Sequence, residues 1–109
     1  GGVSLGLIAL AHTIGAFLDD TLVGFITMVV MQRPHYEARI ASYESYFVAE
    51  HARKSGAGLA LLHAAEKLGA SQGAVGLFVN AAVGSRTDDF FSAKRDYLNT
   101  HNVYLKRLQ

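Results

Sequence analysis

The chain has 109 residues, which is enough for one hydrophobic core. Half of the residues are hydrophobic and 17% are charged, so the composition excludes a disordered chain, which lacks the apolar surface to offset its ordering entropy. The net charge of +1 gives no reason to expect a nucleic-acid partner, and the absence of cysteine excludes disulfides, thiolate metal ligands and a cysteine nucleophile.

The longest apolar runs, at residues 3–11 and 22–31, are too short to span a bilayer, so no membrane partner is expected. A chain without cysteine fits the reducing cytosol, and we expect a cytoplasmic protein. The first two residues are glycines rather than methionine. We interpret them as a tag remnant or an internal start, so the sequence is expected to be a piece of a longer chain.

The first elements come before residue 32. Residues 3–12 are too continuously apolar for the period to separate helix from strand, and we expect a short buried helix. Residues 13–18 are expected to be a strand, and Asp19 and Asp20 a turn. Residues 21–31 are rich in β-branched side chains and are expected to be a second strand, covered on both faces, that completes a β-hairpin.

The middle of the chain changes from strand to helix. Residues 32–39 contain the only proline and are expected to be a loop, followed by an aromatic-rich strand at residues 40–48. A glycine-rich turn then opens an amphipathic helix that is expected to end with Gly69 as its cap. The apolar face of this helix is formed by Leu61, Leu62, Ala65 and Leu68.

The last third predicts two strands and one helix. Residues 74–79 are expected to be a buried strand, and residues 103–108 a closing strand. Between them, Thr87 is expected to cap a helix with acidic residues in its first turn and basic residues near its end, the order that the helix dipole favours. Phe90, Ala93 and Tyr97 give this helix an apolar face.

The order of these elements predicts an α/β fold. We expect a mixed, mostly antiparallel central sheet with helices on both faces. Residues 40–79 should form a right-handed parallel strand-helix-strand crossover within it. The sequence contains no internal repeat and no low-complexity segment, so residues 1–109 are expected to form a single domain.

A candidate anion site lies where the strand at residues 40–48 leads into the helix. The first N–H groups of a helix lack partners, the helix dipole adds positive potential, and glycines let an anion approach the backbone. Arg53 adds a full charge, and Lys54 and Ser55 add side-chain donors. Residues 53–59 are therefore predicted to hold a pyrophosphate or a similar anion. The alternative is a glycine turn that merely starts a helix.

Residues 46–62, YFVAEHARKSGAGLALL, resemble the acetyl-CoA signature of the GNAT family of N-acetyltransferases. That signature is a strand ending in valine, a short polar arch, and Q/R-x-x-G-x-G/A opening a helix; Arg53, Gly56 and Gly58 stand at its defining positions. Residues 21–26, TLVGFI, are similar to the family's hairpin strand. Residues 73–80, 86–97 and 103–106 resemble its later elements in the right order.

The resemblance implies an acyl-CoA N-acyltransferase-like domain without the family's usual first strand and first helix. It implies acetyl-CoA as cosubstrate and transfer of the acetyl group to a primary amine by direct attack. The pyrophosphate is expected on the loop amides, and the pantetheine arm along the preceding strand, beside the next parallel one. The cofactor-binding residues that it implies are Tyr46, Phe47, Val48, Arg53, Lys54, Ser55, Gly56, Ala57, Gly58, Leu59 and Asn80.

The expected catalytic residues are Glu44, Tyr97 and Tyr104. Glu44, between two tyrosines, is the first choice for the base that deprotonates the amine, although it also fits a solvated strand-face charge. Many family members have a tyrosine on the last helix that protonates the leaving thiolate, and here Ser92 stands in that region. The role would then fall to water, Tyr97 or Tyr104.

Other functions stay open at this point. The five histidines show no metal-binding spacing, so no metal is predicted. The acceptor is expected to be a small-molecule or peptide amine, with its identity left open. One alternative is a degenerate module that binds CoA or a protein without turnover. Another is a homodimer formed through the apolar amino-terminal segment, because a missing first strand would leave a sheet edge open.

Overall fold

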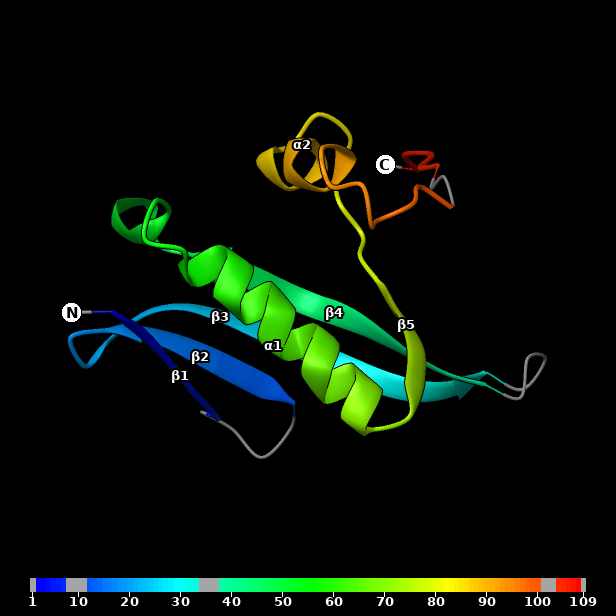
Figure 1. Ribbon diagram of the computed structural model, residues 1–109. Coiled ribbons are helices and arrows are strands. Elements are labelled where there is room, and N and C mark those ends of the chain that lie inside the picture. The colour runs from blue at the N-terminus through cyan, green and yellow to red at the C-terminus, as the bar shows by residue number, and fades with distance from the viewer. Residues whose placement is uncertain (1, 8–11, 34–37, 101–103, 109) are drawn as a thin grey trace. The chain divides into compact units, whose positions relative to one another are not determined.

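The computed structural model describes residues 2–7, 12–33, 38–100 and 104–108. They fall into two compact units, Gly1–Val79 and Asn80–Gln109. The first unit contains β1 (Val3–Leu7), β2 (Thr13–Leu18), β3 (Thr21–Arg33), β4 (Ala38–Val48), a short 3-10 helix (Glu50–Ala52), α1 (Ala57–Ser71) and β5 (Ala74–Phe78) (Figure 1). The second unit contains α2 (Arg86–Ser92).

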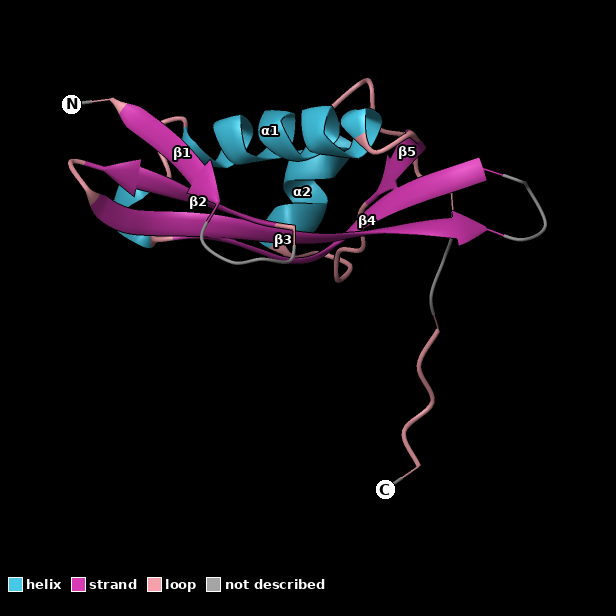
Figure 2. Ribbon diagram, turned by 90° about the horizontal axis from the view of Figure 1, so that it is seen from below, coloured by secondary structure: helices cyan, strands magenta, loops and turns pink. Residues whose placement is uncertain are grey.

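The strands form one sheet in the order β1-β2-β3-β4-β5. The first four are antiparallel neighbours, and β5 is parallel to β4. The mixed, mostly antiparallel sheet with a parallel β4-α1-β5 crossover is therefore confirmed. Within the first unit, α1 lies along one face of this sheet (Figure 2).

The amino-terminal segment is a strand, and the helix expected over residues 3–12 is wrong. β1 pairs with β2 in a register that runs from Val3↔Leu18 to Leu7↔Ile14. A continuous apolar run fits either structure, so the decision falls to tertiary contacts, and here the open edge of β2 provides a pairing partner. Residues 8–11 of the expected helix lie outside the described residues.

The β2–β3 hairpin matches the prediction and extends further than expected. Asp19 and Asp20 both have positive φ, 48° and 66°, which a two-residue hairpin turn of type I′ requires. The loop expected at residues 32–39 is shorter, because Gln32 pairs with Arg39 and Arg33 with Ala38. Residues 34–37, between these pairs, are not among those described.

The core lies between α1 and the sheet. Its largest fully buried side chains are Ile26, Met28, Leu61 and Leu62. The helix does not end at Gly69, as expected. That residue is buried within α1, where an added Cβ would lie 3.3 Å from the Cβ of Ala41. Gly73, with φ of 85°, takes the left-handed conformation after the helix instead.

Two strands are less covered than predicted. On β3, Val23, Ile26 and Met28 face the core, whereas the strand was expected to be buried on both faces. Met31 is 50% exposed near its end. β5 was expected to be buried, but its Val75 is 77% exposed. β5 lies at the end of the strand order, and its Ala74 and Leu77 pack against the core whereas Val75 does not.

In the second unit, Ser85 caps α2, rather than the predicted Thr87. The Ser85 hydroxyl accepts a hydrogen bond from the Asp88 N–H at 3.1 Å, and an Asp88 carboxylate oxygen accepts one from the Gly84 N–H at 2.8 Å. These reciprocal bonds satisfy amides at the start of the helix. Asp88 and Asp89 lie in the first turn as expected, but α2 ends before the basic residues that were expected near its end.

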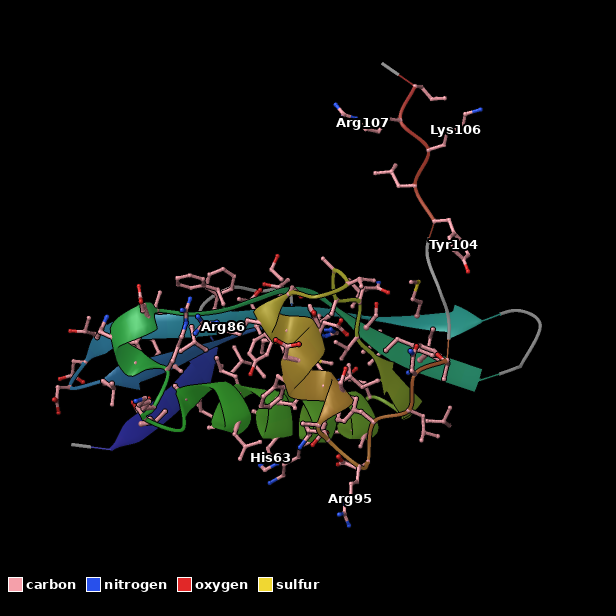
Figure 3. The ribbon with its side chains drawn as sticks, turned by 90° about the horizontal axis from the view of Figure 1, so that it is seen from above. His63, Arg86, Arg95, Tyr104, Lys106 and Arg107 are labelled. Atoms are coloured by element: carbon pink, nitrogen blue, oxygen red, sulfur yellow. The ribbon has the colours of Figure 1, made fainter. Side chains whose placement is uncertain are left out.

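The strand expected at residues 103–108 is absent from its described part. Residues 104–108 have no regular secondary structure, and Tyr104 is 88% exposed (Figure 3). Apolar alternation stabilises a strand only when a neighbouring strand is available, and no pairing involves this segment in the described part of the chain. Among the helices of the described residues, none is both long and apolar enough to cross a bilayer.

Candidate functional site

An open strand edge leads to the predicted loop. The parallel pairing of β4 with β5 reaches only as far as Ser42↔Phe78, where β5 ends. β4 continues for six more residues to Val48. Within the described ranges, residues 43–48 therefore have a strand neighbour on the β3 side only. The pairing of β4 with β5 thus ends where the resemblance implies that these strands separate.

The register shows which backbone groups face this open edge. The Ala49 N–H donates to the Val23 carbonyl at 2.7 Å, and the next pair is Gly24↔Val48. Because hydrogen-bonded and non-hydrogen-bonded pairs alternate between antiparallel strands, Val48 and Tyr46 turn their N–H and C=O groups away from β3. These two residues thus offer main-chain donors and acceptors to the open edge.

Glu44 occupies an irregular position on β4. The β3–β4 register changes from Thr27↔Ser45 to Met28↔Tyr43, so Glu44 is the extra residue of a β-bulge. Bulges re-aim side chains and are frequent beside active sites. The structure describes the Glu44 backbone but not its side chain, so its role as a base stays a prediction.

The loop between β4 and α1 is ordered by its own hydrogen bonds. Gly56 has φ of 89°, a left-handed conformation that glycine adopts without strain, and α1 begins at the next residue. The Ser55 hydroxyl accepts from the Ala57 N–H at 3.2 Å and donates to the Ala52 carbonyl. The expected role of Ser55 as a side-chain donor to an anion stays a prediction. Gly56 occupies the cap position without a side chain, and the Ser55 hydroxyl beside it satisfies the first helical N–H instead.

Several main-chain donors of the loop have no acceptor. The N–H groups of Arg53 and Ser55 bond to the carbonyls of Glu50 and Ala52. In contrast, the N–H groups of Lys54, Gly56, Gly58 and Leu59 donate to no other group of the described residues. No described atom lies within 4 Å of a Cβ built at Gly56, so the loop is open at that residue. Such a helix start binds anions.

The positive charge at this helix start is not neutralised. Arg53 and Lys54 are exposed, and neither forms an ion pair within the part of the chain that the structure describes. The first turn of α1 contains no acidic residue that would neutralise the positive potential of the helix start. The Arg53 Nε donates to the Val48 carbonyl at 3.3 Å, which joins the loop to the open edge of β4.

Tyr46 connects the strand to the helix in a way that the sequence does not reveal. Its hydroxyl donates to the Gly58 carbonyl, and its ring meets that of Tyr43 edge-on, with centroids 5.9 Å apart. Burial, with a smaller contribution from Tyr43, raises the pKa of Tyr46 to about 12. The hydroxyl is therefore protonated at neutral pH and acts as a donor.

The first unit brings most of the predicted cofactor-binding residues together. Residues 46–48 and 53–59 form one continuous strand end, arch and helix start. Ala52, fully buried in the core, anchors the arch, and sequence reasoning had assigned it no role. The sequence signal that could have identified Ala52 is a small apolar residue inside a polar stretch. The His63 side chain lies on the side of α1 turned away from the sheet (Figure 3).

Three predicted residues lie in the second unit. Asn80 begins that unit, and Tyr104 lies on the irregular segment near its end. The Tyr97 ring packs against Phe91, with centroids 4.9 Å apart. The cofactor-binding role of Asn80 and the acid roles of the two tyrosines stay predictions.

The comparisons with known proteins agree with this geometry. The model of the acetyltransferase (GNAT) family matches residues 7–95. An aminoglycoside acetyltransferase from an uncultured soil metagenomic sample, solved with trehalose, has a TM-score of 0.76 at 21% identity. That match covers 89% of this chain and 64% of the enzyme, so the chain spans less than two thirds of that enzyme's length.

Further solved structures share the fold. A ribosomal-protein-alanine N-acetyltransferase from Brucella melitensis biovar Abortus 2308 has a TM-score of 0.75 at 20% identity, over 89% of this chain and 69% of its own. A GNAT family acetyltransferase from Staphylococcus aureus has a TM-score of 0.70 at 16% identity, over 88% of this chain and 64% of its own. No curated protein matches the sequence. The family match over residues 7–95 and the shared fold show that the chain belongs to the GNAT family of acetyltransferases.

Proposed function

We propose that the chain binds acetyl-CoA along β4 and the following loop, and transfers the acetyl group to a primary amine. One observation carries the proposal: among the described residues, a strand edge without a neighbouring strand ends at Val48, directly before a loop with four N–H groups that have no acceptor and two cations that form no ion pair. A strand edge suits a ligand with amide groups, and the loop suits a phosphate. Acetyl-CoA contains both in one molecule.

The residues present fit such a ligand. The loop N–H groups and the charges of Arg53 and Lys54 would hold the pyrophosphate. The backbone groups of Tyr46 and Val48 would pair with the amides of the pantetheine arm, as a neighbouring strand would. The open space at Gly56 lets the phosphates approach the backbone closely.

The bound cosubstrate supplies a thioester whose carbonyl carbon accepts the amine nitrogen, so that a C–N bond forms, the C–S bond breaks, and the thiol gains a proton as the amine loses one. The residues of the chain orient the thioester and polarise its carbonyl group. A main-chain N–H at the open edge of β4 is the proposed donor to the carbonyl oxygen, where negative charge develops. Glu44 is the proposed base, and Tyr97 or Tyr104 the proposed acid.

The acceptor is proposed only as a class. Among the solved relatives, one is an aminoglycoside acetyltransferase and another a ribosomal-protein-alanine N-acetyltransferase. We therefore propose a small-molecule or peptide amine for this chain. A cytoplasmic location and a homodimer remain part of the proposal.

Calorimetric titration of the chain with CoA and with acetyl-CoA tests the binding step. We expect one site for each, and binding that weakens as salt is added, because the phosphate contacts are ionic. Absence of binding at low salt would overturn the proposal. Release of CoA thiol with a panel of aminoglycosides, polyamines and amino-terminal peptides then tests transfer, and binding without release from any amine would indicate the module without turnover.

A further inference from the structure

The Tyr46–Gly58 hydrogen bond fixes a peptide unit of the candidate phosphate loop. Gly58 is the second residue of α1, and its carbonyl accepts from the Tyr46 hydroxyl on β4. A carbonyl oxygen has two lone pairs, so this bond can coexist with the bond to the next helical turn. The tyrosine therefore attaches the start of α1 to the strand whose open edge lies beside it.

This bond also determines the direction of a loop donor. The Gly58 carbonyl and the Leu59 N–H belong to the same planar peptide group, so fixing one end fixes the other. In a helix the two ends point in opposite directions, and the Leu59 N–H therefore points out of the start of the helix. That N–H is one of the four loop donors without an acceptor among the described residues.

The space around Gly58 is set by the same hydroxyl. A Cβ at Gly58 would lie 3.0 Å from the Tyr46 hydroxyl oxygen. The next atoms, Val48 Cγ2 at 3.6 Å and Tyr46 Cζ at 4.0 Å, are at ordinary contact distance. Among the described atoms, the hydroxyl is thus the one tight contact that an alanine at this position would make. The acetyl-CoA signature accepts glycine or alanine at this position, and the close hydroxyl favours glycine here.

We infer that Tyr46 is a positioning residue: its hydroxyl holds the Gly58–Leu59 peptide in the orientation that receives a phosphate, before the ligand arrives. The inference rests on the proposed function and adds a side-chain role to a residue for which only a backbone role was expected. A loop that is already ordered loses less conformational freedom on binding, so affinity rises. The raised pKa keeps the hydroxyl protonated over the neutral range.

The substitution Tyr46→Phe tests the inference, because it removes the hydroxyl and retains the ring that packs against Tyr43. We expect CoA to bind roughly three- to tenfold more weakly, because the loop loses a hydrogen bond that orders it before binding. Calorimetry well below the unfolding temperature measures the affinity. Amide hydrogen exchange in the free protein should show lost protection at Ala60, whose N–H bonds to the Gly56 carbonyl in the first helical turn.

Thr13→Val is the matched control. Thr13 and Thr27 share a hydrogen bond between their hydroxyls at 3.1 Å, within the β2–β3 pair. The substitution removes one hydroxyl from the first unit but leaves β4 and the loop unchanged. We expect it to lower stability without changing CoA affinity. If Tyr46→Phe and Thr13→Val weaken CoA binding equally, or neither weakens it, the inference is overturned.

A double-mutant cycle gives an independent test. Gly58→Ala should weaken CoA binding in the natural chain, where the methyl group meets the hydroxyl, and have little further effect in the Tyr46→Phe background. Additive losses would contradict the inference. A natural chain that binds no CoA would instead overturn the proposed function itself, and this result is distinct from every outcome among the variants.

Discussion

Gly24 on β3 and Phe47 on β4 lie so close together that a Cβ atom at Gly24 would be 2.7 Å from the Phe47 carbonyl oxygen. The same atom would be 3.3 Å from Val48 Cα and 3.3 Å from Leu61 Cδ1. Two of these three neighbours are main-chain atoms, which cannot rotate away as a side chain can. The absence of a side chain at Gly24 therefore lets β3 approach β4 closely beside the end of the open strand edge.

The substitution Gly24→Ala should force β3 and β4 apart. We expect the free energy of unfolding to fall by about 1–3 kcal/mol, the usual cost of overpacking, and CoA affinity to fall with it. Gly76→Ala on β5 is the control, since no described atom lies within 4 Å of its Cβ position. Urea unfolding of both variants provides the measurement. Equal stability of the two variants would show that the close approach has no energetic consequence.

Arg53 and Lys54 should contribute to CoA affinity through their positive charges. We expect Arg53→Ala to weaken CoA binding roughly tenfold, because it removes a charge-assisted bond and the donor to the Val48 carbonyl. Lys54→Ala should weaken it less, since an ammonium binds phosphate as a point charge. Both variants should show a smaller dependence of affinity on salt.

Lys67→Ala is the control for these two substitutions. Lys67 is an exposed cation of α1, well beyond its first turn. Its removal changes the net charge equally, and CoA affinity at moderate salt should stay unchanged. If all three substitutions reduce affinity by the same factor, the effect belongs to net charge and the loop has no special role.

Local chemistry made the loop predictable from the sequence. A glycine-rich turn after a polar arch and before an apolar helical period indicates a helix start, and α1 begins at Ala57. The β2–β3 turn was predictable for the same reason, because two aspartates separate two apolar runs. In each case the conformation depends on residues that are adjacent in the sequence.

The features that sequence reasoning missed depend on distant contacts. β1 is a strand because the edge of β2 is available for pairing, and the hydrophobic periodicity of the segment does not reveal this. The Tyr46–Gly58 bond joins residues twelve positions apart, and the packing of α1 against β4 brings them together. Residues 104–108 show the converse, since a strand-like pattern stays irregular where no described strand pairs with it.

The partly buried hydroxyl of Tyr46 should make stability sensitive to alkali. Burial raises the pKa of Tyr46 from 10.0 to about 12, so between these values the folded chain keeps a proton that the unfolded chain has lost. Because the folded state then binds more protons, the free energy of unfolding must fall as pH rises through this range. Burial also raises the pKa of Tyr43, which adds a decline of the same sign.

The free energy of unfolding of the Tyr46→Phe variant should therefore decline less steeply with pH than that of the natural chain. Urea unfolding at several values from pH 9 to pH 11.5 measures the two slopes. Tyr104→Phe is the control, since this tyrosine is 88% exposed and should leave the slope unchanged. Equal slopes for the natural chain and Tyr46→Phe would mean that the hydroxyl is as well solvated in the folded state as in the unfolded one.

The start of α2 allows the predicted and observed helix caps to be tested against each other. Ser85→Ala removes the acceptor of the Asp88 N–H and should destabilise the helix by about 1 kcal/mol. Thr87→Ala places the better helix former within the first turn and should be neutral or slightly stabilising. Backbone chemical shifts and amide exchange over residues 86–92 of the full chain report the helix directly. Because α2 has only seven residues, the loss of one cap should reduce its population visibly. A larger loss in Thr87→Ala than in Ser85→Ala would restore the sequence-based choice of cap and contradict the observed one.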